Sequence, residues 1–287
     1  MSTIQQYHLH RLNPGKLQFE VYDLKSYLEK HGRKASVPHS HSYYQIIWFF
    51  KAKGRHIVDF KTFDINDNTI LFIAKDQIHA FDSDNNDGWL IHFNESFFMH
   101  TEVDIFLKYN IFKTQENPCY APEKDTLAKG KNYIQLILNE LENRSNFGFE
   151  DTVRFLLKSF LINLERVHQK RAPEKIEVNN TQTLKLYQFK ELVEAHYKQG
   201  LSVNEYAKLM AVSSKTLNSI TKSTTHKSPS ELIMGRVVLE AKRLLRYTSL
   251  QISEIAYQLG FEDPSYFIKY FKRHVGHSPL EFRNTLH

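Results

Sequence analysis

The chain has 287 residues, of which 41% are hydrophobic, and it carries 38 Lys and Arg against 32 Asp and Glu, a formal net charge of +6. This length allows two globular domains with ordinary cores. A single cysteine, Cys119, excludes an intrachain disulfide, and the sequence shows no signal segment and no long apolar helix, so we expect a soluble cytoplasmic protein that does not bind membranes.

The first part of the chain is residues 1–123, and within it the residues from about Phe19 to Phe98 have a composition typical of β-strands. Short runs rich in branched and aromatic residues, such as YYQIIWFF and TILFIA, are separated by polar turns such as DINDN and DSDNNDG. Many short strands in succession predict a small barrel or sandwich, and a barrel of this size has room for one ligand. Because side chains alternate along a strand, one of two sets would line the interior: Tyr44, Ile46 and Trp48, or Tyr43, Gln45 and Ile47.

Residues 124–168 change to a helical pattern with two apolar stripes. The first stripe contains Leu127, Ile134, Ile137, Leu138 and Leu141. The second contains Val153, Leu156, Leu157, Phe160, Leu161 and Leu164. Because the second stripe is broad enough to cover both its own barrel and a partner, we expect a homodimer contact through Val153, Leu156, Phe160, Leu161 and Leu164.

Residues 169–182, with the sequence QKRAPEKIEVNNTQ, are polar, lack periodicity and contain Pro173. This composition is typical of an interdomain linker. It separates the upstream part from a C-terminal domain that we place at residues 183–287.

The C-terminal domain begins with a predicted pair of short helices joined by a turn. Ser202 and Glu205 form a capping box at the start of the first helix, and the second helix runs from about Ser214. The side chains predicted to face a DNA partner from this second helix are Ser214, Lys215, Asn218, Ser219 and Lys222.

A longer helix follows, from Ser230 to Arg246. Its predicted apolar side consists of Leu232, Val238, Ala241, Leu244 and Leu245. A helix of this length spans about 25 Å. When the width of the packed helices is added, the distance between the two helix pairs on either side of it comes close to the ~34 Å that separates successive turns of a DNA duplex.

The second helix pair occupies QISEIAYQLGFEDPSYFIKYFKRHVG, with a tight turn at Gly260. Asp263 caps the second helix and Pro264 suits its first position. The stripe Phe267, Tyr270 and Phe271 is predicted to be buried, and the remaining surface carries Ser265, Ile268, Lys269, Lys272 and Arg273. This is the pattern of a helix-turn-helix, whose second helix enters the DNA major groove, although an ordinary helical hairpin with a solvated basic face has the same pattern.

An internal repeat favours DNA binding over the ordinary hairpin. A shift of 49 residues aligns Leu201, Val203, Glu205 and Ala207 with Leu250, Ile252, Glu254 and Ala256. A shift of 50 residues aligns Leu217, Lys222, Ser228, Pro229 and Glu231 with Phe267, Lys272, Ser278, Pro279 and Glu281. The extra residue falls in the turn, so two units of one design lie in tandem.

The positive charge is confined to this domain. Residues 183–287 hold 15 Lys and Arg against 9 Asp and Glu, whereas residues 1–182 hold 23 of each class. Phosphate affinity requires cations at the contact surface, so this distribution indicates a polyanionic partner. We expect Lys269 to contact base edges and Lys272 or Arg273 to contact phosphates. Ile268 faces either a thymine methyl group or a neighbouring helix.

The segment ISEIAYQLGFEDPSYFIKYFKRHVGHSPLEFR resembles the signature of the AraC/XylS family of transcription regulators, and the resemblance extends from Leu201 to Arg283. It implies a domain of two helix-turn-helix units joined by a long helix, double-stranded promoter DNA as the partner, and a contact with RNA polymerase. Ser219 stands where Arg or Lys is common in the family, which leaves the base preference of the first unit open.

The upstream PHSHSYYQ and AKDQIH resemble the cupin-like effector domain that many members of this family carry. The resemblance implies a small-molecule effector, of unknown identity, bound by residues among His39, His41, Tyr44, Gln45, Trp48 and His79. In metal-binding cupins a carboxylate stands where this chain has Gln45, so we expect no metal and no cofactor, with the histidines capping strands or lining a polar pocket.

Taken together, these patterns predict an α+β protein of two domains that acts as a sequence-specific transcription regulator and not as an enzyme. Two other functions are compatible with parts of the sequence. A cupin enzyme with a DNA-binding tail would require metal at His39, His41 and His79, and an architectural protein would bind DNA without reading bases. No phosphate-binding Gly-rich loop, GxSxG motif or paired cysteines at zinc spacing are present.

Overall fold

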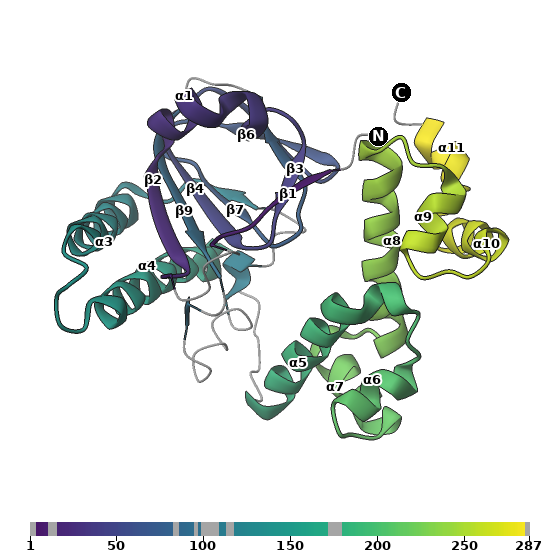
Figure 1. The fold of residues 1–287 in the computed structure, drawn as a ribbon. Helices are drawn as coiled ribbons and strands as arrows, with labels where there is room; N and C mark the ends of the chain where they lie inside the picture. The colour runs from purple at the N-terminus through teal and green to yellow at the C-terminus, as the bar shows by residue number, and fades with distance from the viewer. Residues whose placement is uncertain are drawn as a thin grey trace. The chain divides into compact units, whose positions relative to one another are not determined.

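The computed structural model describes residues 4–10, 16–82, 86–94, 97–98, 109–112, 118–171 and 180–284. The chain forms two compact units: Gln5–Ile176, which we call the β unit, and Glu177–His287, which we call the helical unit. Among the described residues, no helix has the length and apolar character needed to cross a membrane. Figure 1 shows the elements of both units.

Two five-stranded sheets form the β unit (Figure 1). The first has the order β1 (Gln5–Tyr7), β3 (His39–His41), β8 (His79–Phe81), β5 (Gly54–Val58) and β6 (Lys61–Ile65). The second has the order β10 (Cys119–Tyr120), β7 (Ile70–Ile73), β4 (Tyr44–Lys51), β9 (Asp87–Phe93) and β2 (Phe19–Asp23). The pairings are antiparallel except between β1 and β3. The predicted cupin-like β-structure is confirmed.

Helix α1 (Leu24–Ala35) interrupts the region that the sequence predicted to be β throughout, so that prediction is wrong here. Asp23 caps the helix by accepting a hydrogen bond from the Ser26 N–H at 2.8 Å. Leu24, Leu28 and Ala35 are buried against the strands. Spacings of four and seven residues put these side chains on one helical face, while most of the intervening residues are polar.

Alternate residues of the second sheet face opposite ways into two apolar cores. Ile47, Phe49, Leu71 and Leu90 face the interior of the β unit together with α1. The opposite face, which includes Ile46, Trp48, Ile70, Phe72 and Ile91, packs against the helices that follow the strands. The period-two alternation of strand side chains therefore separates an inner core from an outer one.

The outer core is completed by α3 (Lys124–Glu142) and α4 (Phe149–Arg171), which form a helical hairpin over the sheet (Figure 1). The Trp48 ring stacks on Phe160 with centroids 5.8 Å apart. A Cβ at Gly130 would lie 2.8 Å from the Trp48 ring, so only glycine lets α3 approach at this point.

The predicted dimer contact through the α4 stripe is corrected by this packing. Of the predicted contact residues, Val153, Phe160, Leu161 and Leu164 are at most 1% exposed and lie in the outer core, and Leu156 is half-buried against it. Side chains already buried within the chain present no surface to a partner. The stripe is broad because α4 contacts both the sheet and α3.

Eight short elements make up the described part of the helical unit: α5 (Asn180–His196), η4 (Tyr197–Gln199), α6 (Val203–Leu209), α7 (Ser214–Thr225), α8 (Pro229–Tyr247), α9 (Ile252–Gln258), α10 (Pro264–Val275) and α11 (Pro279–Asn284). One core joins them, with Phe189, Leu217, Ala241, Ile255 and Phe267 among its fully buried members. The predicted apolar side of α8 needs one correction, because Val237 is buried while Val238 is only half-buried.

The tandem repeat is visible in these elements. Helices α6 and α9 each have seven residues, and α7 and α10 each have twelve. The extra residue of the second copy lies between α9 and α10. Helix α4 extends to Arg171 and α5 begins at Asn180, so both ends of the predicted linker 169–182 are helical, and residues 172–179 lie outside the described part of the chain.

Candidate DNA-contact surface and ligand pocket

The start of each helix in the first helix-turn-helix is fixed by side-chain caps. The Ser202 N–H donates to Glu205 Oε2 at 2.7 Å, and the Glu205 N–H donates to Ser202 Oγ at 3.4 Å, which is the reciprocal capping box expected from the sequence. The Ser202 hydroxyl, which also donates to Glu205 Oε2 at 2.7 Å, and the Ser202 N–H together lower the pKa of Glu205. Ser213 caps α7 by accepting from the Thr216 N–H at 3.0 Å.

On α7 the predicted DNA-contact side chains lie opposite the buried Leu217 and Ile220. Lys215, Ser219 and Lys222 are exposed, and Ser214 and Asn218 are half-buried. The Ser214 hydroxyl is hydrogen-bonded to Asn204 of α6, which orients the first turn of α7 against the preceding helix. The helix thus presents a polar face with two lysines.

On α10 the cap is Asp263, whose Oδ1 accepts from the Ser265 N–H at 2.8 Å, and Pro264 occupies the first turn. Phe267 and Phe271 are fully buried, and Tyr270 packs at the edge of the same core. The five predicted contact residues, Ser265, Ile268, Lys269, Lys272 and Arg273, are all exposed. Ile268 is 38% exposed, so within this chain it is not buried against a neighbouring helix.

Gly260 makes the turn between α9 and α10 possible. Its φ of +82° lies in the left-handed region, and a Cβ at this position would stand 2.0 Å from the carbonyl oxygen of Lys198. The turn therefore packs directly on the backbone of η4. Ala211, one repeat earlier, also has a positive φ, of 52°, so the first unit makes the same turn without glycine.

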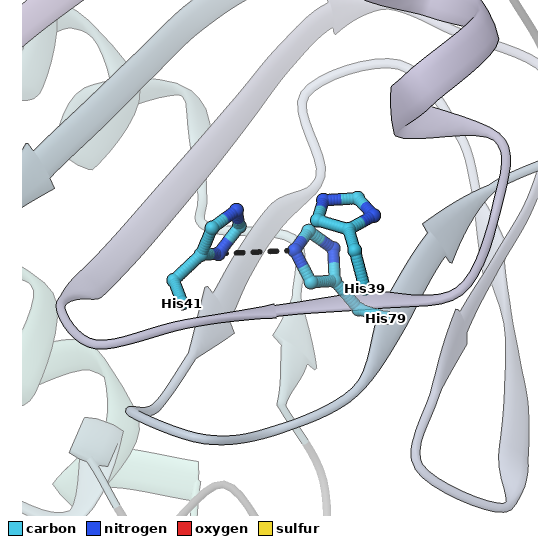
Figure 2. Close-up of side chains that lie close together, drawn as sticks. All are labelled: His39, His41 and His79. Atoms are coloured by element: carbon cyan, nitrogen blue, oxygen red, sulfur yellow. Dashed lines mark hydrogen bonds between the residues drawn. The ribbon is translucent and has the colours of Figure 1, made fainter. Parts of the chain in front are cut away.

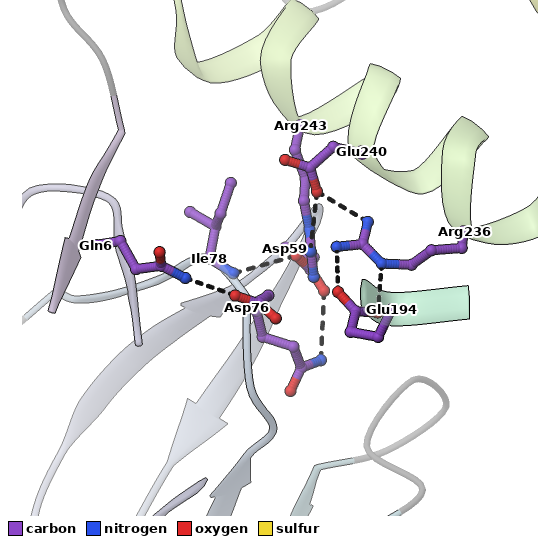
Figure 3. A network of polar contacts seen from close by, with 9 residues as sticks. Gln6, Asp59, Asp76, Ile78, Glu194, Arg236, Glu240 and Arg243 are labelled. Carbon is purple, nitrogen blue, oxygen red and sulfur yellow. Dashed lines mark hydrogen bonds and ion pairs between the residues drawn. The ribbon is translucent and has the colours of Figure 1, made fainter. Parts of the chain in front are cut away.

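Arg236 of α8 ties α5 to the centre of the helical unit (Figure 3). Its guanidinium donates to both oxygens of Glu194 at 2.7 Å and to Glu240 at 2.9 Å, and it lies 4.0 Å from the centroid of the Tyr197 ring. Burial would lower the pKa of Arg236, but the hydrogen bonds to Glu194 and the nearby negative charges raise it. This bidentate pair fixes the long helix that carries both helix-turn-helix units.

In the β unit, five histidines are buried in the inner core. His39, His41 and His79 lie together, and one ring nitrogen of each is within 4.8 Å of the others (Figure 2). His79 Nε2 is 3.2 Å from His41 Nδ1, and His79 Nδ1 is 2.9 Å from His56 Nε2. The cluster joins β3, β8 and β5 across the first sheet.

Burial lowers the pKa of every one of these histidines, because a charged imidazolium loses its hydration in the apolar interior. The pKa values of His56 and His92 fall to about 3. Those of His41 and His79 fall well below the usual value, with the neighbouring histidines adding to the effect of burial. The cluster is therefore neutral at physiological pH, and its rings offer lone pairs.

A cavity of about 320 Å³ opens next to this cluster. It is lined by Tyr7, His8, Leu9, His10, Glu20, Tyr22, Tyr27, His31, Tyr43 and His92. Four tyrosines and four histidines give it hydroxyl and imidazole groups for hydrogen bonding together with ring faces for stacking, a lining suited to a small polar ligand.

The structure separates the residues predicted to bind an effector. His39, His41, Gln45 and His79 lie in the inner core, whereas Trp48 belongs to the outer core and Tyr44 packs against it. Of the two alternatives left open by the sequence, the inner face of β4 is therefore that of Tyr43, Gln45 and Ile47. None of the six predicted residues lines the cavity, but Tyr43 does.

Sequence reasoning missed most of the cavity lining. Tyr27 and His31 are four residues apart on α1, and this spacing would have placed them on one face if the helix had been predicted. His92 shares a strand face with Leu90, so the alternation in GWLIHF carried a usable signal once the inner face was known. Tyr7 lies on the short strand β1, which has no comparable pattern.

Two protein families match the chain, one in each unit. Residues 27–94 match the AraC-like ligand binding domain, and residues 206–285 match a helix-turn-helix domain. Both matches fall within elements described above, the first from α1 to β9 and the second from α6 to α11.

Relatives of known name are similar over most of the chain or over part of it. The HTH-type transcriptional activator RhaS of Mannheimia succiniciproducens is 25% identical over 248 residues, which are 85% of this chain and 88% of the relative. The Msm operon regulatory protein of Streptococcus mutans is 32% identical over 110 residues, 38% of this chain and 40% of the relative. A solved AraC-type transcriptional regulator from Chromobacterium violaceum is 27% identical over 38% of this chain and 96% of its own, with a TM-score of 0.34.

The two family matches occur in the order expected for a sensor followed by a DNA-binding domain, and each coincides with a unit whose geometry suits that role. The chain belongs to the AraC family of DNA-binding transcription regulators.

Proposed function

We propose that this regulator reads its promoter site with α7 and α10 and that a small polar molecule in the β unit controls the reading. The observation that carries the first half is the repeat itself. Two twelve-residue helices follow equivalent turns, each buries one apolar stripe, and each exposes a polar face with lysines. Paired recognition helices on one rigid support are the arrangement by which a single chain contacts two successive major grooves.

The support is helix α8, which is capped at its start by Ser228 and Glu231 and held to α5 through Arg236. Its nineteen residues correspond to about 28 Å at the usual rise per residue. The contact residues that we propose are Ser214, Lys215, Asn218, Ser219 and Lys222 on α7 and Ser265, Ile268, Lys269, Lys272 and Arg273 on α10. We assign Lys269 to a base edge and the last two residues to phosphates.

Genome-wide mapping of the DNA bound by the full chain in its source organism tests this function. We expect a motif of two conserved blocks about 10 base pairs apart, since each recognition helix enters one turn of the groove. The regulated genes would follow from the same map. Bound DNA without any shared motif would contradict sequence-specific reading and would favour the architectural alternative.

The cavity in the β unit supports control of the regulator by a small polar molecule. It is bounded by β1, β2, α1 and β9, it has a volume of about 320 Å³, and hydroxyl and imidazole groups predominate in its lining. Tyr27→Phe removes one hydroxyl from the lining while keeping the ring. We expect this variant to lose the response of a reporter promoter to the inducing growth condition without losing DNA affinity. Tyr133→Phe, on α3 and outside the cavity, is the matched control.

We further propose that the chain acts as a homodimer and that it activates transcription through a contact with RNA polymerase. Its relative RhaS is a transcriptional activator. The α3–α4 hairpin supports the dimer, because Leu136 is 51% exposed and Phe155 is 56% exposed on it. Sedimentation should show that Phe155→Glu weakens self-association of the full chain, whereas Asn132→Glu on exposed α3 surface does not. A wild-type chain that stays monomeric at high micromolar concentration would contradict the dimer.

A further inference from the structure

The histidine cluster of the inner core has the arrangement of a set of metal ligands. His39 and His41 are two residues apart on β3, so they project to the same side of the sheet, and His79 reaches them from the neighbouring strand β8 (Figure 2). His39 is 5% exposed, His41 1% and His79 0%. The three ligand nitrogens lie within 4.8 Å of one another, so a single ion could contact all of them after small movements.

Hydrogen bonds to groups outside the trio use one nitrogen of His39 and one of His79, and the other nitrogen of His79 faces His41 within the trio. His39 Nδ1 is 2.8 Å from the carbonyl oxygen of Val37, which can only accept, so the proton sits on Nδ1 and the lone pair on Nε2. His79 Nδ1 is 2.9 Å from His56 Nε2, and the tautomer of His79 that donates this bond keeps its lone pair on Nε2, which faces His41 Nδ1. Carbonyl and imidazole partners of this kind orient the histidine ligands of metal sites.

The separation of one pair of these ring nitrogens matches that of two ligands of a tetrahedral ion. His79 Nε2 and His41 Nδ1 are 3.2 Å apart. Two nitrogens at the ~2.0–2.1 Å bond length of Zn²⁺ and a tetrahedral angle are roughly 3.3 Å apart. The two rings are thus already separated as two ligands of one zinc ion would be.

A second, independent feature is an unsatisfied oxygen in the same interior. Gln45 lies on the inner face of β4 and is 2% exposed, and its Oε1 has no hydrogen-bond partner among the described residues. A buried carbonyl oxygen in that state destabilises the fold, because it has lost its hydrogen bonds to water. An ion or a water molecule bound within reach of Oε1 would supply the missing partner, and the resemblance to metal-binding cupins puts a carboxylate ligand at this position.

We propose that His39, His41 and His79 bind a divalent transition-metal ion, Zn²⁺ best fitting the spacing, with an oxygen ligand completing the tetrahedron. Three neutral imidazoles and one further position are a known zinc ligand set. The ion would cross-link β3 to β8, and Tyr7 of β1, whose ring centroid is 5.4 Å from that of His39, covers the cluster. This site is separate from the DNA-contact surface and does not depend on the proposed function.

The alternative is a chain of hydrogen-bonded neutral histidines that fills the core without metal. Cobalt separates the two, because Co²⁺ bound tetrahedrally to nitrogen ligands absorbs visible light strongly. The full chain, stripped with a chelator, would be titrated with CoCl₂ alone and then with ZnCl₂. We expect one equivalent of tetrahedral Co²⁺ per chain, displaced by Zn²⁺, and a metal-dependent rise in the melting temperature.

Variants then locate the ion. A change in a residue behind the metal ligands weakens metal binding by ~10–100-fold, and we expect a loss of Co²⁺ affinity in this range for His56→Gln. We expect a larger loss for each of the ligand variants His39→Gln, His41→Gln and His79→Gln. His277→Gln, at an exposed position of the helical unit, is the control for adventitious surface binding and should bind like the wild type.

Two results would overturn the site: a wild-type chain that binds no stoichiometric Co²⁺ or Zn²⁺, and binding that the control variant loses while the three ligand variants keep it. If a ligand variant fails to fold, X-ray absorption of the zinc-loaded wild type decides. A first shell with three imidazole nitrogens supports the proposal, and a shell of oxygen ligands alone contradicts it.

Discussion

At the scale of single residues, the proposed DNA-contact surface depends on exposed side chains, whose position along the helix sets what each one contacts. Lys269 and Lys272 are both exposed on α10, three residues apart. We propose that only the first reaches base edges, because recognition helices read bases near their start and meet phosphates further along. The two lysines therefore offer a matched pair, identical in chemistry and different in position.

Lys269→Ala should reduce affinity for the cognate site by ~1–3 kcal/mol more than affinity for random DNA, since a lost base contact affects only the correct sequence. Lys272→Ala should weaken both equally and reduce the salt dependence of binding by about one phosphate contact. Competition binding at several salt concentrations measures both effects. An equal loss on cognate and random DNA for Lys269→Ala would refute the assignment to a base edge.

Two glycines with similar backbone angles provide a second residue-scale test. Gly260 and Gly276 have φ of +82° and +87°, but a Cβ would meet the Lys198 carbonyl oxygen at Gly260 and nothing within 4 Å at Gly276. Gly276→Ala should cost about 1 kcal/mol, the price of the left-handed conformation. Gly260→Ala adds a backbone clash and should cost at least about 3 kcal/mol. Chemical denaturation of both variants measures the difference, and equal losses would show that the turn does not pack on η4.

At the scale of elements, the helical unit depends on the junction of α5, η4 and α8. Arg236 has a side chain only 12% exposed, and its partner Glu194 is 38% exposed. A guanidinium in this position is stabilising only while both carboxylates accept from it, because removal of one partner leaves the others desolvated. The junction also sets the direction of α8, from which both helix-turn-helix units extend.

Arg236→Met keeps the apolar stem but removes the hydrogen bonds to Glu194 and Glu240. We expect a loss of about 2–3 kcal/mol in the stability of the helical unit, as for other hydrogen bonds to charged groups. Lys227→Ala, at an exposed position after α7, should change stability by less than about 0.5 kcal/mol. Urea unfolding followed by circular dichroism compares them. If Arg236→Met unfolds at the same denaturant concentration as the control, the ion pair does not hold α5 in place.

At the scale of the whole molecule, the two units have separate cores. The helical unit contains α5 to α11, with both helix-turn-helix copies and the charge excess of residues 183–287. A compact unit with its own core folds as a domain when its boundary falls in a polar segment.

A fragment from about Asn179 to His287 should therefore melt cooperatively and prefer the cognate site over scrambled DNA at moderate salt. Its affinity should be ~10²-fold or more below that of the full chain, since loss of the proposed dimer removes the high effective concentration of a second DNA-binding domain. Calorimetry and competition binding measure folding and preference in turn. A folded fragment without sequence preference would place part of the recognition in the β unit.

The sequence by itself determined the helical unit and its likeness to a family, because its signals are local. Caps such as Ser202 with Glu205 and Asp263 with Pro264, and stripes such as Phe267 and Phe271, act over a few residues, and the observed helices begin and end close to where these signals place them. The repeat reinforced each signal with a second copy. The strand-rich nature of the β unit was also readable, since branched and aromatic runs between polar turns have few other structures available.

Only the tertiary structure decided which side chains of the β unit face the inner core and which face the outer core. A strand pattern fixes the alternation of side chains but not which face is inside. The packing of α3 and α4 on the second sheet places Trp48 in the outer core and Gln45 in the inner one. The same packing buried the stripe on α4 that the sequence had left available for a partner. The cavity and the histidine cluster gather residues from β1, α1, β3, β8 and β9, which are far apart along the chain. No local interaction specifies such an assembly, because it forms only when distant strands pair and remove these side chains from water.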